Sequence, residues 1–259
     1  MDGMDSEWRR LPESVRLWVA GTVGGRVLGF DPSGEANPGE VVGVVRSIRG
    51  PPVLRAVPAD SPGADHYRFD ARVTMALPDE VPAAELVRAG QSDGWIVLIF
   101  EEPDGRPPAQ PWRAEELARV TGLLDELTPV LTPSPIEGLP VLADGDTLLH
   151  FDLHPGTVRL PRRGQPTMLD WGSACTGPAW ADTVRLLVDG DLGSLDPEQI
   201  FLATARGSRA PAAEVDALLD HLAYTWGSEA EDPATPESLC ARRAASALAA
   251  TRWLQQRRG

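Results

Sequence analysis

The sequence predicts an α+β protein of two lobes, a small strand-rich lobe over residues 1–102 and a larger, mainly helical lobe over residues 103–259. Three observations support this division. Short apolar and β-branched segments bounded by Gly and Pro fill the first hundred residues. Beyond residue 112 the apolar residues recur with helical spacing. A polar, Pro-rich stretch, Glu101–Trp112, lies between the two regions and has the composition of a hinge.

Four segments of the first lobe have the length and composition of strands: Arg26–Phe30, Val41–Ile48, Val53–Val57 and Trp95–Phe100. The last of these is an uninterrupted apolar run, so we expect it to be buried on both faces. Turn formers join the first two segments over residues 31–39, and a Gly-Pro-Pro hairpin joins the next two. Phe69, Val73 and Ala76 share one helical face, which predicts a short helix over Tyr67–Leu77.

The second lobe begins with a predicted helix over Arg113–Leu127, in which five apolar residues follow i, i+3, i+4 spacing. We expect Pro129 to end that helix, because proline lacks the backbone N–H that the helix needs. Later segments with helical patterns are Trp180–Val188, Pro211–Tyr224 and Pro236–Gln256.

Composition excludes several classes of function. The chain carries 38 acidic against 24 basic residues, a formal charge of −14, which argues against nucleic acid as the main partner. All the basic residues are arginine, so neither a Schiff-base lysine nor a phosphate-loop lysine is available. The amino terminus lacks a signal-peptide pattern, and the longest apolar run is far shorter than the roughly 20 residues that cross a bilayer. We therefore expect a cytoplasmic protein that does not enter a membrane.

The segment 147–172 carries the chemistry. An apolar strand leads into a loop with Asp152, and two short strands joined by a turn then lead to Asp170. Phosphoryl transfer uses two such carboxylates, one that orients the attacking hydroxyl and one that holds magnesium on the phosphates. This arrangement predicts a kinase-type catalytic segment.

Other interpretations of these residues are possible. Asp152 alone has the character of a turn former. His150, Asp152 and His154 alternate, so a strand would place them on one side as a metal site, but Pro155 and the glycine after it break that strand.

The motifs HFDLHPGTV (residues 150–158) and LDWGSACTGPAWAD (169–182) resemble the catalytic loop and the metal-binding segment of the aminoglycoside phosphotransferase family. That family is the small-molecule branch of the protein-kinase-like fold. The resemblance implies a two-lobed kinase-like fold that uses ATP or GTP with Mg²⁺. It further implies that Asp152 orients the acceptor hydroxyl, that Asp170 binds Mg²⁺ and that Thr157 occupies the position of a second metal ligand. Asp182 would brace the catalytic loop and take no part in the reaction.

The resemblance extends more loosely to the first lobe. Ser33–Gly39 would form the turn that covers the nucleotide, Arg55 would contact ATP, and Asp70 would be its acidic partner. The strand Trp95–Glu102 would meet the adenine through the backbone of its last residues, Phe100, Glu101 and Glu102.

This chain departs from the family at four positions. Arg55 replaces a lysine, Asp70 a glutamate, Phe151 a glycine and Thr157 an asparagine. Arg55 and Asp70 can still form an ion pair, although arginine and lysine are not equivalent at a phosphate. A hydroxyl in place of an amide oxygen weakens one metal site.

Two hypotheses of different classes follow. The first is a kinase that transfers the γ-phosphoryl group of ATP or GTP to a hydroxyl of a small molecule, or of a peptide Ser or Thr. The alternative is a catalytically impaired pseudokinase that serves as a peptide- or partner-binding module in a biosynthetic pathway, and it is motivated by the four altered positions.

Overall fold

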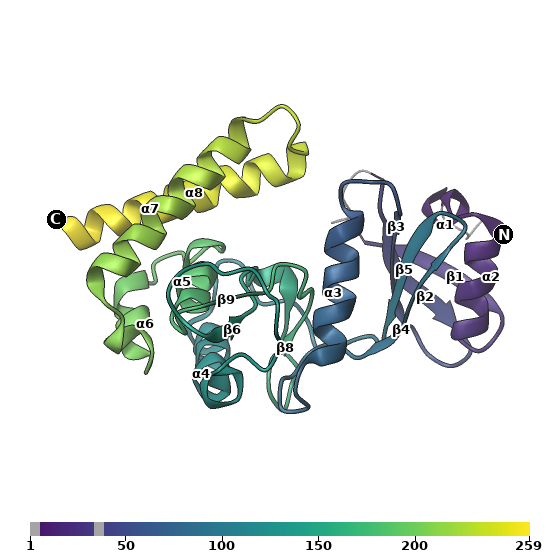
Figure 1. Ribbon diagram of the computed structural model, residues 1–259, viewed down its shortest axis with the longest axis horizontal. Helices are drawn as coiled ribbons and strands as arrows, with labels where there is room; N and C mark the ends of the chain where they lie inside the picture. The colour runs from purple at the N-terminus through teal and green to yellow at the C-terminus, as the bar shows by residue number, and fades with distance from the viewer. Residues whose placement is uncertain (1–5, 34–38) are drawn as a thin grey trace. The chain divides into compact units, whose positions relative to one another are not determined.

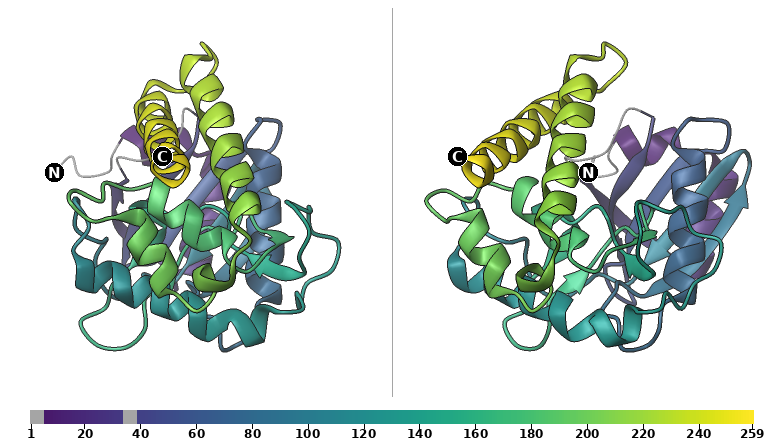
Figure 2. Two further views of the ribbon diagram at one scale, coloured as in Figure 1. Left: turned by 90° about the vertical axis from the view of Figure 1, so that its left-hand side faces the viewer. Right: turned by 60° about the vertical axis from the view of Figure 1, so that its left-hand side comes forward.

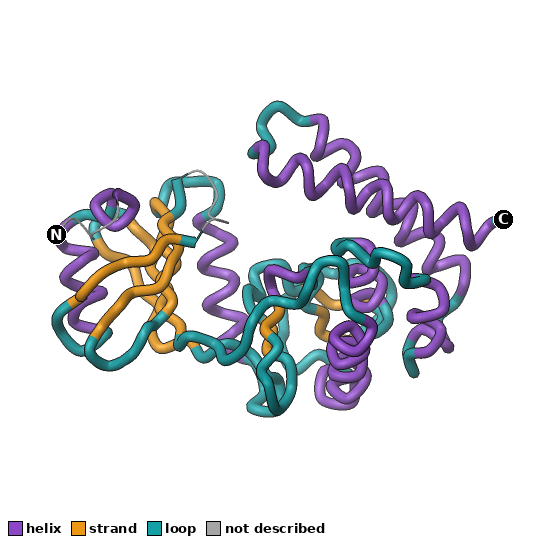
Figure 3. Tube along the Cα trace, turned by 180° about the vertical axis from the view of Figure 1, so that it is seen from behind, coloured by secondary structure: helices purple, strands orange, loops and turns teal. Residues whose placement is uncertain are grey.

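The computed structural model describes residues 6–33 and 39–259, and the chain divides into two compact units (Figure 1). The first unit comprises Met1–Ala76 and Ala83–Pro103, and the second comprises Leu77–Pro82 and Asp104–Gly259. Residues 34–38 of the predicted nucleotide-covering turn lie outside the described residues. In Figure 3 the first unit is rich in strands and the second is mainly helical, so the predicted α+β class is confirmed.

The first unit is built on an antiparallel sheet with the strand order β1-β2-β3-β5-β4. Its strands are β1 (Val27–Pro32), β2 (Val41–Ser47), β3 (Val53–Pro58), β4 (Leu86–Ser92) and β5 (Trp95–Phe100). The four predicted strands are all present. The apolar patterns do not predict β4, which is an edge strand with several exposed residues.

Helices cover both faces of this sheet. They are α1 (Ser6–Arg10), α2 (Glu13–Thr22) and α3 (Ala64–Ala76). Successive residues of β5 point to opposite faces, so Val97 and Ile99 join the core under α1 and α2, whereas Ile96 and Leu98 join the core under α3. The prediction that β5 is buried on both faces is therefore confirmed. The helix predicted at Tyr67–Leu77 is α3, which begins three residues earlier.

Helices form most of the second unit. They are α4 (Ala114–Leu131), α5 (Ala181–Val188), α6 (Pro197–Ala203), α7 (Ala212–Glu231) and α8 (Glu237–Arg258), with short 3₁₀ turns η1 (Pro155–Thr157) and η2 (Gly207–Arg209). The last two helices run antiparallel and pack along each other (Figure 2). Among the described residues, no helix has both the length and the apolar character needed to cross a membrane.

The helix α4 corrects one prediction, since it continues through Pro129 to Leu131. The missing N–H of Pro129 removes one hydrogen bond in the last turn only. Leu127 and Leu131 are both buried, and this burial favours the additional turn.

Four short strands frame the loop predicted to be catalytic. They are β6 (Thr147–Leu149), β7 (Val158–Arg159), β8 (Thr167–Met168) and β9 (Cys175–Gly177). β6 pairs with β9, and β7 pairs with β8 as the predicted hairpin. The chain between β6 and β7 carries Asp152, and Asp170 follows β8 by two residues.

Candidate catalytic site

Asp182 holds the start of the loop that carries Asp152. Its carboxylate accepts hydrogen bonds from the backbone N–H groups of His150, at 2.9 Å, and Phe151, at 2.8 Å. Asp182 is buried in the first turn of α5, so both bonds are shielded from water. Hydrogen bonds to an ionised acceptor are stronger than neutral ones. The bracing role predicted for Asp182 is confirmed.

Backbone strain is concentrated at this site. Three of the described non-glycine residues have a left-handed backbone conformation. Two of them lie at this site, Phe151 with φ 54° and Asp170 with φ 63°, and the third, Asp93, lies in the β4–β5 turn. This region disfavours L side chains, most of all bulky ones. Phe151 stands where the resembled family has glycine, the residue that adopts this conformation freely. Strain of this kind persists where the surroundings impose it and is common at functional sites.

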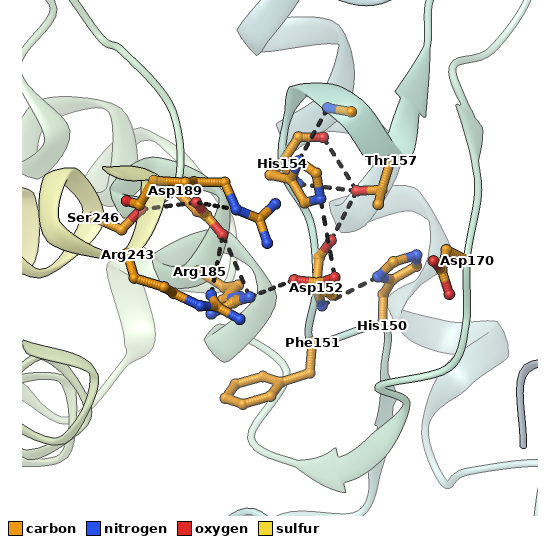
Figure 4. A network of polar contacts seen from close by, with 12 residues as sticks. His150, Phe151, Asp152, His154, Thr157, Asp170, Arg185, Asp189, Arg243 and Ser246 are labelled. Carbon is orange, nitrogen blue, oxygen red and sulfur yellow. Dashed lines mark hydrogen bonds and ion pairs between the residues drawn. The ribbon is translucent and has the colours of Figure 1, made fainter. Parts of the chain in front are cut away.

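His150 links the two acidic segments (Figure 4). Its Nε2 lies 2.8 Å from the carbonyl oxygen of Leu169, the residue before Asp170, and its Nδ1 accepts the backbone N–H of Asp152 at 3.2 Å. A carbonyl can only accept, so Nε2 carries the proton. The ring also packs on Trp171, with centroids 4.7 Å apart. The residues before and after the hairpin are thereby held in one arrangement.

Thr157 is engaged by the loop itself. Its hydroxyl donates to the carbonyl of Asp152 at 2.7 Å and accepts the backbone N–H of His154 at 3.0 Å. In Figure 4 these contacts direct the hydroxyl toward Asp152 and His154. Its oxygen retains at most one lone pair for a metal ion.

The Asp152 carboxylate forms an ion pair with Arg185 of α5, through Oδ1. Burial by itself raises the pKa of Asp152, but the positive charges around the carboxylate, that of Arg185 first and that of His154 second, together outweigh this effect, and the pKa falls below its usual value. Asp152 is therefore ionised at neutral pH. Its second oxygen, Oδ2, lies 3.9 Å from Nε2 of His154, beyond hydrogen-bonding distance.

His154 is uncharged at neutral pH. Burial lowers its pKa to about 4, and the nearby Asp152 offsets only part of that effect. Its Nδ1 accepts the backbone N–H of Gly156 at 3.1 Å, as a neutral ring permits. Arg185 is thus the cation that balances Asp152.

Arg185 belongs to the site although it lies outside both sequence motifs. Its side chain is only 5% exposed and lies 3.4 Å from Asp189 and over the ring of Trp226, with its guanidinium carbon 4.3 Å from the ring centroid. A signal was present in the sequence, since Arg185 interrupts the apolar run of α5 between Val184 and Leu186. An arginine at a buried helical position requires an acidic partner.

The first unit brings Arg55 and Asp70 together, as predicted. Arg55 on β3 donates to the fully buried carboxylate of Asp70 on α3 at 2.7 Å. Thr74 donates its hydroxyl to the other Asp70 oxygen at 3.2 Å, and the guanidinium lies 4.7 Å from the ring centroid of Tyr67. The pair is rigidly held within this unit.

The three predicted adenine-contact residues lie at the end of β5. Phe100 is buried in the core under α3, whereas the side chains of Glu101 and Glu102 are exposed. The backbone N–H of Glu101 donates to the carbonyl of Glu85 at 2.9 Å. That N–H is therefore already used within the first unit.

The donor set permits a magnesium site of limited size. No group of three or more His, Cys, Asp or Glu side chains in residues 6–33 and 39–259 is arranged to hold a metal ion. Magnesium on a nucleotide needs only one or two carboxylates, because phosphates and water complete its shell. The partly buried Asp170, which follows the hairpin and has a left-handed backbone with φ 63°, fits that requirement.

The fold is that of small-molecule phosphotransferases with a two-lobed, kinase-like architecture. The aminoglycoside phosphotransferase APH(4)-Ia, solved as a ternary complex of a thermostable mutant with ADP and hygromycin B, matches with a TM-score of 0.61 and 12% identity. The match covers 92% of this chain and 98% of that one. The fold predicted from the two motifs is confirmed.

Two further solved structures have the same architecture. A microcompartment-associated aminopropanol kinase matches with a TM-score of 0.57 and 16% identity, over 88% of this chain and 93% of that one. The macrolide 2′-phosphotransferase MphH from Brachybacterium faecium matches with a TM-score of 0.56 and 17% identity, over 88% and 97%. No protein-family model and no curated protein sequence matches this chain.

Proposed function

We propose that this protein transfers the γ-phosphoryl group of ATP or GTP to a hydroxyl group of a small molecule. The observation that carries the proposal is the placement of Asp152 before and Asp170 after one hairpin, with hydrogen bonds of His150 linking the two segments. Phosphoryl transfer depends on positioning and electrostatics, so two well-held carboxylates are the main requirement of the protein. The fold shared with three small-molecule phosphotransferases supports the same reaction class.

Asp152 would orient the acceptor. Its ionised Oδ2 would accept the hydrogen bond of the acceptor hydroxyl, while Arg185 holds Oδ1 in place. A carboxylate whose pKa is lowered is a weak base, so its main contribution is alignment of the attacking oxygen. That oxygen forms a new bond to the γ-phosphorus, the bond to the bridging oxygen breaks, and the nucleoside diphosphate leaves. The hydroxyl proton passes through Asp152 to solvent.

The residues proposed to contact the nucleotide have separate roles. Asp170 would bind Mg²⁺, which neutralises the charge that develops on the phosphates. Arg55, fixed by Asp70, would contact the phosphates, and the backbone at Glu102 would meet the base. We assign Thr157 to bracing the loop, with any contribution to the metal shell secondary. The complexes of APH(4)-Ia with ADP and AMP-PNP support an adenine nucleotide as donor.

Transfer is tested with purified full-length protein, Mg²⁺ and either ATP or GTP, against a panel of alcohols that includes a Ser/Thr peptide. Asp152→Asn should lower kcat by about 100-fold or more and leave nucleotide binding intact. Asp170→Ala should abolish the magnesium-dependent part of nucleotide binding in a calorimetric titration. The matched control is Asp144→Asn, an exposed aspartate of the same unit. An Asp152→Asn enzyme as active as the wild type would refute the proposal.

A pseudokinase is the second candidate because two observations favour it. The Arg185–Asp152 ion pair occupies an oxygen of the carboxylate that the reaction needs, and the Glu101 N–H is already bonded. This alternative predicts binding of a partner without turnover. Magnesium-dependent phosphate transfer to any alcohol, lost in Asp152→Asn, would exclude it.

A further inference from the structure

Three arginines gather beside Asp152, and we refer to Arg185, Arg242 and Arg243 as the arginine cluster. Arg185 comes from α5, and the other two come from α8. All three lie within 4 Å of the carboxylate of Asp189, at 3.4, 3.9 and 3.8 Å respectively. Figure 4 shows Arg185 between Asp189 and Asp152, with Arg243 close to it. Segments far apart in the sequence thus concentrate positive charge next to the proposed acceptor position.

The carboxylates within the cluster do not satisfy these guanidinium groups. Asp189 is fully buried, and its Oδ1 already accepts the hydroxyl of Ser246 at 2.8 Å. Its distances to Arg242 and Arg243 are too long for hydrogen bonds, and its Oδ2 has none in the described part of the chain. Each guanidinium offers five N–H donors, so the cluster has far more donors than acceptors.

Two donors illustrate the excess. The Nε of Arg185 and the Nη1 of Arg243 are buried and make no hydrogen bond among the described residues. Arg185 is 5% exposed, so water does not readily replace the missing partner. Arg243 lies 2.8 Å from Glu229 through its Nε, but that carboxylate is exposed and not aligned for a hydrogen bond. A buried donor without a partner costs free energy that a bound acceptor would recover.

The guanidinium groups are held in place by packing. Trp226 of α7 contacts both Arg185 and Arg243, whose guanidinium carbons lie 4.3 and 5.3 Å from its ring centroid. Burial lowers the pKa of Arg243, and the neighbouring charges of Arg185 and Arg242 lower it further. The cations therefore repel one another in a fixed arrangement, which an anion would relieve.

We propose that the arginine cluster binds a carboxylate or phosphate group of the acceptor, so that the substrate is an anionic alcohol rather than a polycation. The inference rests on the proposed phosphotransferase function and specifies its substrate class. Arg185 contacts Asp152 directly, so an anion bound to Arg185 places the rest of the acceptor beside the catalytic carboxylate. Arg242 is 31% exposed and gives the cluster its access to solvent, whereas Arg185 and Arg243 are 5% and 14% exposed. The planar guanidinium fork suits two oxygens of one anion.

The test uses four three-carbon compounds that share a vicinal diol and differ only in the group at the third carbon: glycerol, glycerate, glycerol 3-phosphate and 3-amino-1,2-propanediol. Each is titrated by calorimetry into the full-length protein without nucleotide. At least one of the two anions should bind, about tenfold or more tightly than the neutral and cationic diols. The anion that binds identifies the end group as carboxylate or phosphate. Equal binding of all four diols, or no binding by either anion, would overturn the inference.

Variants locate the anion. Arg243→Gln should weaken binding by about tenfold or more, and so should Arg242→Gln, which is more exposed and thus less liable to disturb folding. Arg252→Gln, an exposed position on the same helix, is the matched control and should change affinity by no more than about twofold. If both single variants, Arg242→Gln and Arg243→Gln, bind the anion with wild-type affinity, the cluster does not bind it and serves only to anchor α8.

The titration separates this inference from the proposed function because it requires no turnover. Anion binding at the cluster without phosphate transfer to any alcohol would support the anion-binding site but refute the proposed phosphotransferase function. Transfer to 3-amino-1,2-propanediol or to an aminoglycoside, with no anion binding, would refute the anionic acceptor and leave the phosphotransferase. Where transfer occurs, Arg242→Gln should raise KM more than it lowers kcat, whereas a purely structural role would not produce that split.

Discussion

The ion pair between Arg185 and Asp152 makes a strong prediction about stability. Replacing Arg185 with Met keeps an unbranched side chain against Trp226 and removes only the charge and its hydrogen bonds. Breaking a buried ion pair costs about 3–5 kcal/mol, because the remaining charge is left without a partner. Asp152 retains some exposure, and Asp189 keeps the Ser246 hydrogen bond, so we expect the low end, about 3 kcal/mol.

Urea unfolding measures this loss. A domain of this size has an m-value of about 3 kcal/mol/M, so the midpoint of Arg185→Met should fall by about 1 M with an unchanged slope. Asp152→Asn and the double variant complete a cycle, in which we expect a coupling free energy of about 2 kcal/mol. Arg209→Met, at an exposed position of the same unit, is the control and should leave the midpoint unchanged.

The pH dependence provides a second check on the same pair. The pKa of Asp152 is lower in the folded than in the unfolded protein, so its contribution to stability is full above the unfolded pKa and is lost as pH falls through the folded pKa. Arg185→Met should raise the pKa of Asp152 in the folded protein and thereby reduce the loss of stability at low pH. Additive single variants, or a midpoint within about 0.3 M of the wild type, would refute the assignment of Arg185 as the balancing charge.

Three further predictions concern other buried groups. The pKa of His154 is lowered to about 4, so its contribution to stability is full above pH 6.5 and should fall by up to about 3 kcal/mol as pH decreases to 4. His154→Asn keeps an acceptor for the backbone N–H and should remove this pH dependence, which urea unfolding at a series of pH values measures. Arg55→Met removes the ion pair of the buried Asp70 carboxylate and should destabilise the protein by about 3 kcal/mol, whereas Arg55→Lys should lose less; equal losses would show that charge does not matter there. Burial raises the pKa of Cys175 to about 12, so a thiol reagent should label only Cys240 in the folded protein and both cysteines after denaturation, and rapid native labelling of Cys175 would contradict its burial.

The first unit shows which elements the sequence can predict. Apolar runs such as β5 are recognisable because every residue is buried, and the pattern needs no knowledge of the neighbours. The edge strand β4 has mixed polarity, and it forms because it pairs with β5 through a tight turn. The helix α2 was also missed, since its buried residues, Val15 and Val19, are few and separated by exposed ones. Packing on the sheet stabilises that helix.

In the second unit, some features of the site can be predicted from sequence motifs and others cannot. The motif around Asp152 and the segment around Asp170 could be found because the loop, the hairpin and the bracing aspartate are close in sequence and have local geometric requirements. The engagement of the Thr157 hydroxyl by its own loop depends on side-chain direction, which a motif does not specify.

Local patterns of apolar residues and turns are sufficient to predict the α+β class, most strands of the first unit and the position of the two aspartates. The groups that surround Asp152, in contrast, depend on tertiary packing. Arg185 lies 33 residues after it and Arg243 lies 91 residues after it, and only the packing of α5, α7 and α8 brings these charges together. Electrostatic interactions act through space, so the charge state of Asp152 follows from neighbours that no local pattern identifies.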